Sequence, residues 1–136
     1  MNKIYIFHAT TCIMLMMFLV ATVAKADNTI GPLVSQAYRQ CIGVAPSKVD
    51  ETACLDQEYS RQKVTLSEAY NHLMRGQDPE QSNLIKKAQK AWLKFREVEC
   101  EAQTLKGGSA AYNSHITCLI RLTAHRASEM VGYGAY

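Results

Sequence analysis

The chain has 136 residues, of which 48% are hydrophobic and 20% charged, and its formal net charge is +3 at pH 7. This length suits one domain rather than two. Because the net charge is small and no run of basic residues occurs, the composition argues against nucleic-acid binding.

Residues 1–26 have the pattern of a secretory signal peptide. Met1–Lys3 is a short basic start, and an apolar run follows that is densest at Ile13–Ala21. Ala24 and Ala26 then place small residues where a signal peptidase reads the chain. We therefore predict cleavage before Asp27 and one helical domain over residues 27–136.

An uncleaved membrane anchor is the alternative for this segment, but His8, Thr10 and Thr11 interrupt the apolar run. Cys12 lacks the leucine and small residues of a lipoprotein cleavage site. Removing residues 1–26 leaves 13 basic and 12 acidic residues, so the mature chain is close to neutral. The expected product is a periplasmic or secreted protein without a stable membrane anchor.

The mature chain begins with a polar leader, Asp27–Pro32, and then shows helical periodicity throughout. Breaks occur at Pro46–Ser47, Gly76–Pro79 and Gly107–Ser109, where proline, glycine and capping residues gather. The expected helices run over Leu33–Cys41, Asp50–Arg75, Pro79–Leu105 and Ala110–Met130. Since no alternating strand pattern appears, the chain is predicted to be all-α, a small antiparallel helical bundle.

Each long helix carries apolar residues three or four positions apart, which predicts the side that faces the core. The sets are Leu55, Tyr59, Gln62, Leu66, Ala69 or Tyr70, and Leu73; then Leu84 or Ile85, Ala88, Ala91 or Trp92, Phe95, Val98 and Ala102; then Tyr112, Ile116, Leu119, Leu122 or Thr123, Arg126 and Met130. We expect all three sets to pack inside the bundle.

Four cysteines remain after signal removal: Cys41, Cys54, Cys100 and Cys118. An even number in a small exported chain indicates two disulfides, whereas a zinc knuckle would need a C-x2-C pair that is absent. Short turns bring all four cysteines to one end of the bundle. We favour the local pairs Cys41–Cys54 and Cys100–Cys118, and the nested pairs Cys54–Cys100 and Cys41–Cys118 remain open. Each bridge would add about 3 kcal/mol of stability.

The only tryptophan, Trp92, lies one turn from both Gln89 and Arg96 on the third predicted helix. One interpretation is a polar constellation presented beside the tryptophan. The interpretation we favour is structural: the three residues align the helices, because a buried tryptophan N–H and a buried arginine both need partners.

No catalytic or cofactor motif is present: the sequence has no Gly-rich phosphate loop, no His-Glu metal motif and no serine nucleophile elbow. His115 and Cys118 have the spacing of a thiol–imidazole pair, but Cys118 is expected in a disulfide. His125 and Glu129 have the spacing of a helix-face ion pair. We therefore expect a binding protein rather than an enzyme, with no cofactor and no metal.

The ordered cysteines, the segment Ala88–Cys100 (AQKAWLKFREVEC), the glycines at 107 and 108, and the segment Leu122–Arg126 (LTAHR) carry a family resemblance. Over about Leu33–Met130 the chain resembles the lysozyme inhibitor LprI-like family of small exported bacterial proteins, formerly a domain of unknown function. The resemblance implies a helical exported protein, and in some members inhibition of lysozyme. The chain departs from the namesake in lacking a lipidation cysteine.

An inhibitor must fill or cover the lysozyme cleft, which holds two carboxyl groups. Our candidate binding element is the loop Lys106-Gly107-Gly108-Ser109, which offers a cation, backbone N–H groups and a hydroxyl between two disulfide-linked helices. The simpler alternative is that the two glycines only make the turn.

A second candidate surface is the acidic side of the third helix, with Glu97 and Glu101, which would face a cationic lysozyme. Alternative functions are a periplasmic structural or regulatory protein that docks an envelope partner, and an immunity protein against a cell-wall toxin.

Overall fold

The computed structural model describes residues 33–104 and 110–133, and these residues form four helices and no strand. The helices are α2 (Gln36–Val44), α3 (Lys48–Met74), α4 (Pro79–Thr104) and α5 (Ala111–Gly132). The predicted all-α fold is therefore confirmed. The predicted signal peptide and the loop Lys106–Ser109 lie outside the described residues.

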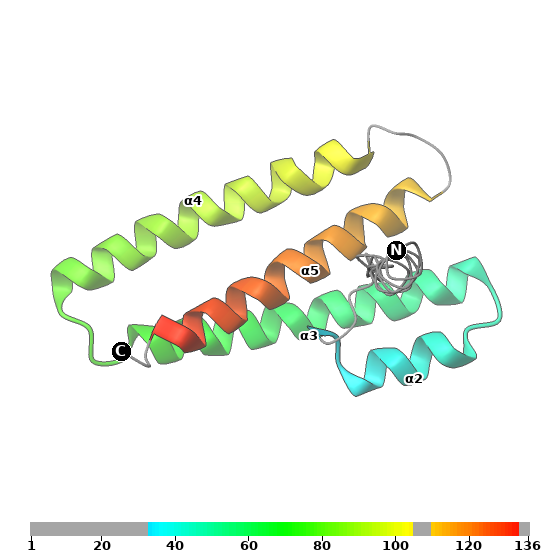
Figure 1. Ribbon diagram of the computed structural model, residues 1–136, viewed down its shortest axis with the longest axis horizontal. Helices are drawn as coiled ribbons and strands as arrows, with labels where there is room; N and C mark the ends of the chain where they lie inside the picture. Colours follow the sequence, from blue (N-terminus) through cyan, green and yellow to red (C-terminus); the bar gives the residue numbers. More distant parts are fainter. Residues whose placement is uncertain (1–32, 105–109, 134–136) are drawn as a thin grey trace, which may run out of the picture.

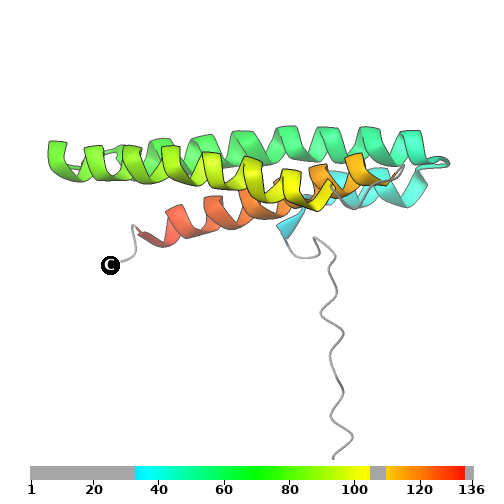
Figure 2. The same ribbon diagram turned by 90° about the horizontal axis from the view of Figure 1, so that it is seen from above.

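Helix α5 is the central element of the bundle, lying between α3 and α4 (Figure 1). It packs most extensively on α3, while α4 packs on α5 and has little contact with α3. Because α4 returns antiparallel to α3, the chain enters α5 in the same direction as α3. Helix α2 folds back along the first half of α3. Figure 2 shows that the three long helices run along roughly the same direction, with α5 inclined to the other two.

Capping residues decide where the helices begin. The Ser35 side chain accepts a hydrogen bond from the Tyr38 N–H, Ser47 accepts from Asp50, and Asp78 accepts from Gln81. The predicted start of the first helix at Leu33 is wrong by three residues, because the Ser35 cap makes Gln36 the first helical residue.

The buried residues form two clusters, one at each end of the bundle. The cluster at the disulfide end contains Val34, Leu55, Ile116, Leu119, Ile120 and both cysteines of the Cys100–Cys118 bridge. The cluster at the other end contains Leu66, Ala69, Leu73, Ala127 and Met130. The predicted core face of α3 is confirmed, and most of the α5 prediction holds, although Tyr112 is exposed.

Both disulfides join neighbouring helices. Cys41 in α2 pairs with Cys54 in α3, and Cys100 in α4 pairs with Cys118 in α5, with Cα–Cα distances of 5.7 and 5.5 Å. The favoured local pairing is therefore confirmed and the nested alternative is wrong. Each bridge closes a short segment of the chain, with sequence separations of 13 and 18 residues.

The predicted core face of α4 is wrong for most of its members, although the alternatives Ile85 and Trp92 do pack against the core. Leu84, Phe95 and Val98 are 61%, 53% and 58% exposed, and Ala88, Ala91 and Ala102 are exposed as well. The face that packs on the bundle is a neighbouring stripe on the same helix. Its members are Ile85, Gln89, Trp92, Arg96 and Cys100.

The reason is the rotation of the helix about its axis. Consecutive residues of an α-helix lie about 100° apart, so Phe95 and Arg96 cannot both face α5. Cys100 must face Cys118 to form the disulfide, and Arg96 then points at Thr123. A covalent bond and a buried hydrogen bond therefore override the simple hydrophobic pattern.

In the part of the chain that the structure describes, the helices are all too short or too polar to span a membrane.

Replacing both Cys100 and Cys118 by alanine should lower the free energy of unfolding by about 3 kcal/mol, because the cross-link that limits the unfolded chain is lost. Urea unfolding followed by circular dichroism measures this loss. Since Cys41–Cys54 closes a loop of similar length, its double alanine variant should lose a similar amount. Unfolding curves that match the wild type would contradict the prediction.

Candidate functional site

A cleft of about 480 Å³ opens at the disulfide end of the bundle, between α2, α3 and α5. Its lining residues are Tyr38, Ile42, Lys48, Glu51, Thr52, Leu55, Ala110, Asn113, Ser114 and Thr117. Apolar side chains from α2 and α3 contribute part of the lining, and polar side chains from α3 and α5 contribute the rest. None of these residues was singled out from the sequence as a binding residue, because they come together only when the helices pack.

Polar contacts order this cleft. Lys48 Nζ donates to Glu51 Oε2 at 2.7 Å, and Thr52 Oγ1 donates to Asn113 Oδ1 at 2.7 Å across the gap between α3 and α5. Burial, with the carboxylates of Glu58 and Glu51 nearby, raises the pKa of Tyr38, so its hydroxyl remains a neutral donor. The cleft therefore combines hydrogen-bond donors and acceptors with the apolar side chains of Ile42 and Leu55, a composition suited to binding a partner.

The predicted binding loop borders this region in sequence, because Ala110 lines the cleft and directly follows Ser109. The loop itself lies outside the described residues. Of the second predicted surface, Glu101 is exposed, while Glu97 has a half-exposed side chain that pairs with Arg96. Because the carboxylate of Glu97 is already paired with Arg96, Glu101 is the carboxylate more available to a partner.

The three residues predicted as structural lie on the face of α4 that packs on α5. The Arg96 side chain is buried, its Nη1 donates to Thr123 Oγ1 at 3.1 Å, and its guanidinium lies 5.3 Å from the Trp92 ring centroid. The guanidinium of Arg126 lies 5.8 Å from the centroid of the same ring, and Arg126 Nε donates to Gln89 Oε1. Two guanidinium groups therefore lie within 6 Å of the Trp92 ring, close enough for cation–π attraction.

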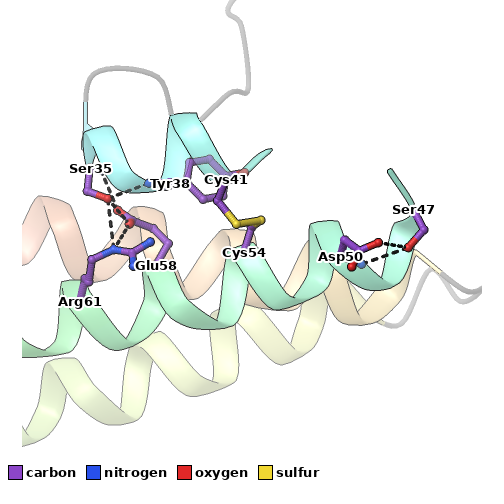
Figure 3. The surroundings of a disulfide bond; sticks show 8 residues. All are labelled: Ser35, Tyr38, Cys41, Ser47, Asp50, Cys54, Glu58 and Arg61. Atoms are coloured by element: carbon purple, nitrogen blue, oxygen red, sulfur yellow. Dashed lines mark hydrogen bonds and ion pairs between the residues drawn. A yellow bond between two sulfur atoms is a disulfide. The ribbon is translucent and has the colours of Figure 1, made fainter. Parts of the chain in front are cut away.

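A buried carboxylate that the sequence analysis missed anchors the chain ahead of α2 (Figure 3). Glu58 is fully buried, and its two oxygens accept four hydrogen bonds. The donors are the Ser35 N–H at 2.8 Å, the Ser35 hydroxyl at 2.6 Å, Arg61 Nε at 2.8 Å and Gln62 Nε2 at 2.7 Å. One sequence signal was available: Glu58 lies in phase with Leu55 and Gln62.

Burial alone would raise the pKa of Glu58, but the hydrogen bonds from Ser35, Gln62 and Arg61 outweigh burial and lower this pKa. A carboxyl group with a lowered pKa in the folded state stabilises the fold at pH values above its unfolded pKa of about 4.3. That stabilisation is lost as the pH falls through the lower, folded pKa.

Glu58→Gln should lower the free energy of unfolding by about 2 kcal/mol at pH 7, because charge-assisted hydrogen bonds are replaced by weaker neutral ones. The difference from wild type should shrink as the pH falls below about 4. Urea unfolding at a series of pH values measures both effects. Glu68→Gln, at an exposed position of the same helix, is the matched control. A constant difference across the pH range would contradict this assignment.

The His, Cys and Glu side chains with catalytic-type spacing are engaged in other contacts or lack a partner of the required kind. Cys118 is in a disulfide, so no thiol is available to His115. Glu129 accepts from Arg126 Nη1 at 3.0 Å, so the ion pair predicted for Glu129 has Arg126 as its partner in place of His125. Among the described residues, no group of three His, Cys, Asp or Glu side chains is arranged to hold a metal ion.

Comparison with known families gives a match over residues 41–130 to the family described as lysozyme inhibitor LprI. The match covers all four disulfide cysteines and most of the residues that line the cleft. It also covers Trp92 and its neighbours Gln89, Arg96 and Arg126.

The chain is also similar to two uncharacterized bacterial proteins. The chain is 42% identical to uncharacterized protein YecT of Escherichia coli strain K12, over 60% of each chain. It is 30% identical to uncharacterized protein R02472 of Rhizobium meliloti strain 1021, over 63% of this chain and 73% of the relative. The alignment therefore spans about 60% of the length of the E. coli protein. No solved structure matches.

Proposed function

Because the chain belongs to the lysozyme inhibitor LprI family, we propose that it is an exported protein that inhibits a lysozyme-type glycan hydrolase by occluding its cleft. The observation that carries the proposal is the family match over residues 41–130. On this proposal the protein is a binding module and not an enzyme.

The proposed binding surface is the disulfide end of the bundle. It combines the loop Lys106–Ser109 with the neighbouring cleft, whose lining begins at Ala110. The two bridges support this choice, because α2, α3, α4 and α5 are cross-linked in pairs close to this end. A surface held by covalent bonds loses little conformational entropy when a partner binds.

The chemistry of the target supports the same surface. A lysozyme presents two carboxyl groups in a groove, and Lys106 supplies a cation of opposite charge. The cleft adds hydroxyl and amide groups, including Thr52, Asn113 and Ser114, that suit hydrogen bonding to groups at the groove edge. Since the mature chain is close to neutral, we expect affinity from these short-range contacts rather than from long-range steering.

Location follows from the N-terminal segment. We propose that residues 1–26 direct export and are removed before Asp27, which places the protein in the periplasm or outside the cell. Two disulfides support this location, because such bonds persist in oxidising compartments.

The first test is inhibition of cell-wall lysis by the purified protein, with lysozymes of the c, g and i types assayed separately. Stoichiometric inhibition of one type would support the proposal. An absence of inhibition at high excess would contradict it and would favour the alternative of docking to an envelope partner.

Ser114→Trp should weaken inhibition by about tenfold or more, because the indole would fill the mouth of the cleft and displace a partner. Ser128→Trp is the matched control, since Ser128 is also exposed on α5 but does not line the cleft. Inhibition constants for both variants measure the effect, and circular dichroism checks the fold. Equal loss in the two variants would exclude the cleft as the contact surface.

The double change Lys106→Glu and Ser109→Trp tests the loop separately. The new carboxylate would face the lysozyme carboxyl groups, so we expect inhibition to fall by more than about tenfold while the unfolding midpoint stays unchanged. Inhibition that survives this double change would show that the loop is not the binding element.

A further inference from the structure

A second, exposed apolar stripe runs along α4. It lies about a quarter turn around the helix from the buried stripe. We call it the outer face of α4, and its members are Leu84, Ala88, Ala91, Phe95, Val98 and Ala102. It extends over about 27 Å of helix. Contiguous exposed apolar surface is uncommon on monomeric proteins and often marks a site of interaction.

The spacing along this stripe is regular. Its residues follow one another at intervals of four, three, four, three and four, which is the heptad repeat of a coiled coil. The buried stripe of the same helix, with Ile85, Trp92 and Cys100, already satisfies the contact with α5. Helix α4 therefore carries a second packing face that its own bundle does not need.

We propose that a second copy of this chain docks on the outer face, with the two α4 helices antiparallel about a two-fold axis near Leu93. Charge complementarity supports a second copy. The half of α4 before Phe95 contains Lys86, Lys87, Lys90 and Lys94, and the half after it contains Glu97, Glu99 and Glu101. An antiparallel pair places each basic half against the acidic half of the other copy.

The flanking residues set the register. Lys87 and Glu101 both lie beside the outer face, and an axis near Leu93 brings Lys87 of one copy next to Glu101 of the other, twice by symmetry. Lys94 lies close to the axis and meets its own copy, so it does not select a register. Glu80, at the start of the helix, is the acidic exception in the basic half.

Side-chain size supports the same arrangement. With this axis Ala91 lies opposite Phe95, Ala88 opposite Val98, and Leu84 opposite Ala102, so each layer combines a large and a small residue. A parallel pair would instead place phenylalanine against phenylalanine and alanine against alanine. The phenylalanine layer would then be overpacked and the alanine layers would leave voids.

This inference is independent of lysozyme inhibition, and it has one consequence for it. Glu101 belongs both to the dimer contact and to the acidic surface considered for a lysozyme. The dimer would cover that acidic surface. The cleft between α2, α3 and α5 would remain open to a lysozyme.

The first experiment is sedimentation equilibrium of the purified protein over a wide concentration range. A helix pair of this length is a small interface, so we expect a reversible monomer–dimer equilibrium. Val98→Asp should raise the dimer Kd about tenfold or more, because an unpaired carboxylate would be buried. Val64→Asp on α3 is the matched control, since both valines are 58% exposed.

A wild type that stays monomeric up to about 1 mM would overturn the proposal, as would equal effects of the two aspartates. A monomeric wild type whose Val98→Asp variant loses lysozyme binding would also overturn it and assign the outer face to the hydrolase.

The second experiment tests the antiparallel register by charge exchange. Lys87→Glu and Glu101→Lys should each weaken self-association, because each places like charges together at both symmetric contacts. Mixing the two variants should restore the dimer as a heterodimer, which native mass spectrometry distinguishes by mass. Failure of the mixture to associate more strongly than either variant alone would overturn the antiparallel arrangement.

Discussion

The rotation of α4 about its own axis is the constraint on which the rest of the structure depends. The Cys100–Cys118 disulfide fixes this rotation at one end of the contact with α5, and the Arg96 hydrogen bond to Thr123 fixes it again one turn away. With α4 held in this way, Trp92 lies close to the guanidinium groups of both Arg96 and Arg126. The apolar stripe with Phe95 is then turned outward, since neighbouring positions differ by about 100°.

Polar groups hold the other side of the bundle. Glu58 lies at the centre of α3's contact with the chain before α2, where Ser35 donates two hydrogen bonds and also caps α2. A buried carboxylate is costly unless its oxygens are satisfied, and here four donors satisfy them. Together with Cys41–Cys54, this network joins α2 to α3 (Figure 3).

These two sets of contacts give the molecule two distinct surfaces. At the disulfide end, the Cys41–Cys54 bridge and the hydrogen bonds of Glu58 hold α2 against α3, and a polar cleft opens between α2, α3 and α5. Along α4, the outer face is apolar and flanked by charges that change sign along the helix. The first suits recognition of a different protein through hydrogen bonds, and the second suits pairing with a copy of itself.

The sequence by itself determined the helical fold, the approximate helix limits and the family, because these depend on residue periodicity, capping and spacing along the chain. It favoured the local disulfide pairs, but only the structure chose them over the nested pairs. Only the tertiary structure decided which of two adjacent stripes on α4 is buried, since both Phe95 and Trp92 satisfy a helical period. It also decided the cleft, whose Thr52 and Asn113 come from separate helices, and the burial of Glu58. Such features depend on contacts between distant segments, which no local pattern contains.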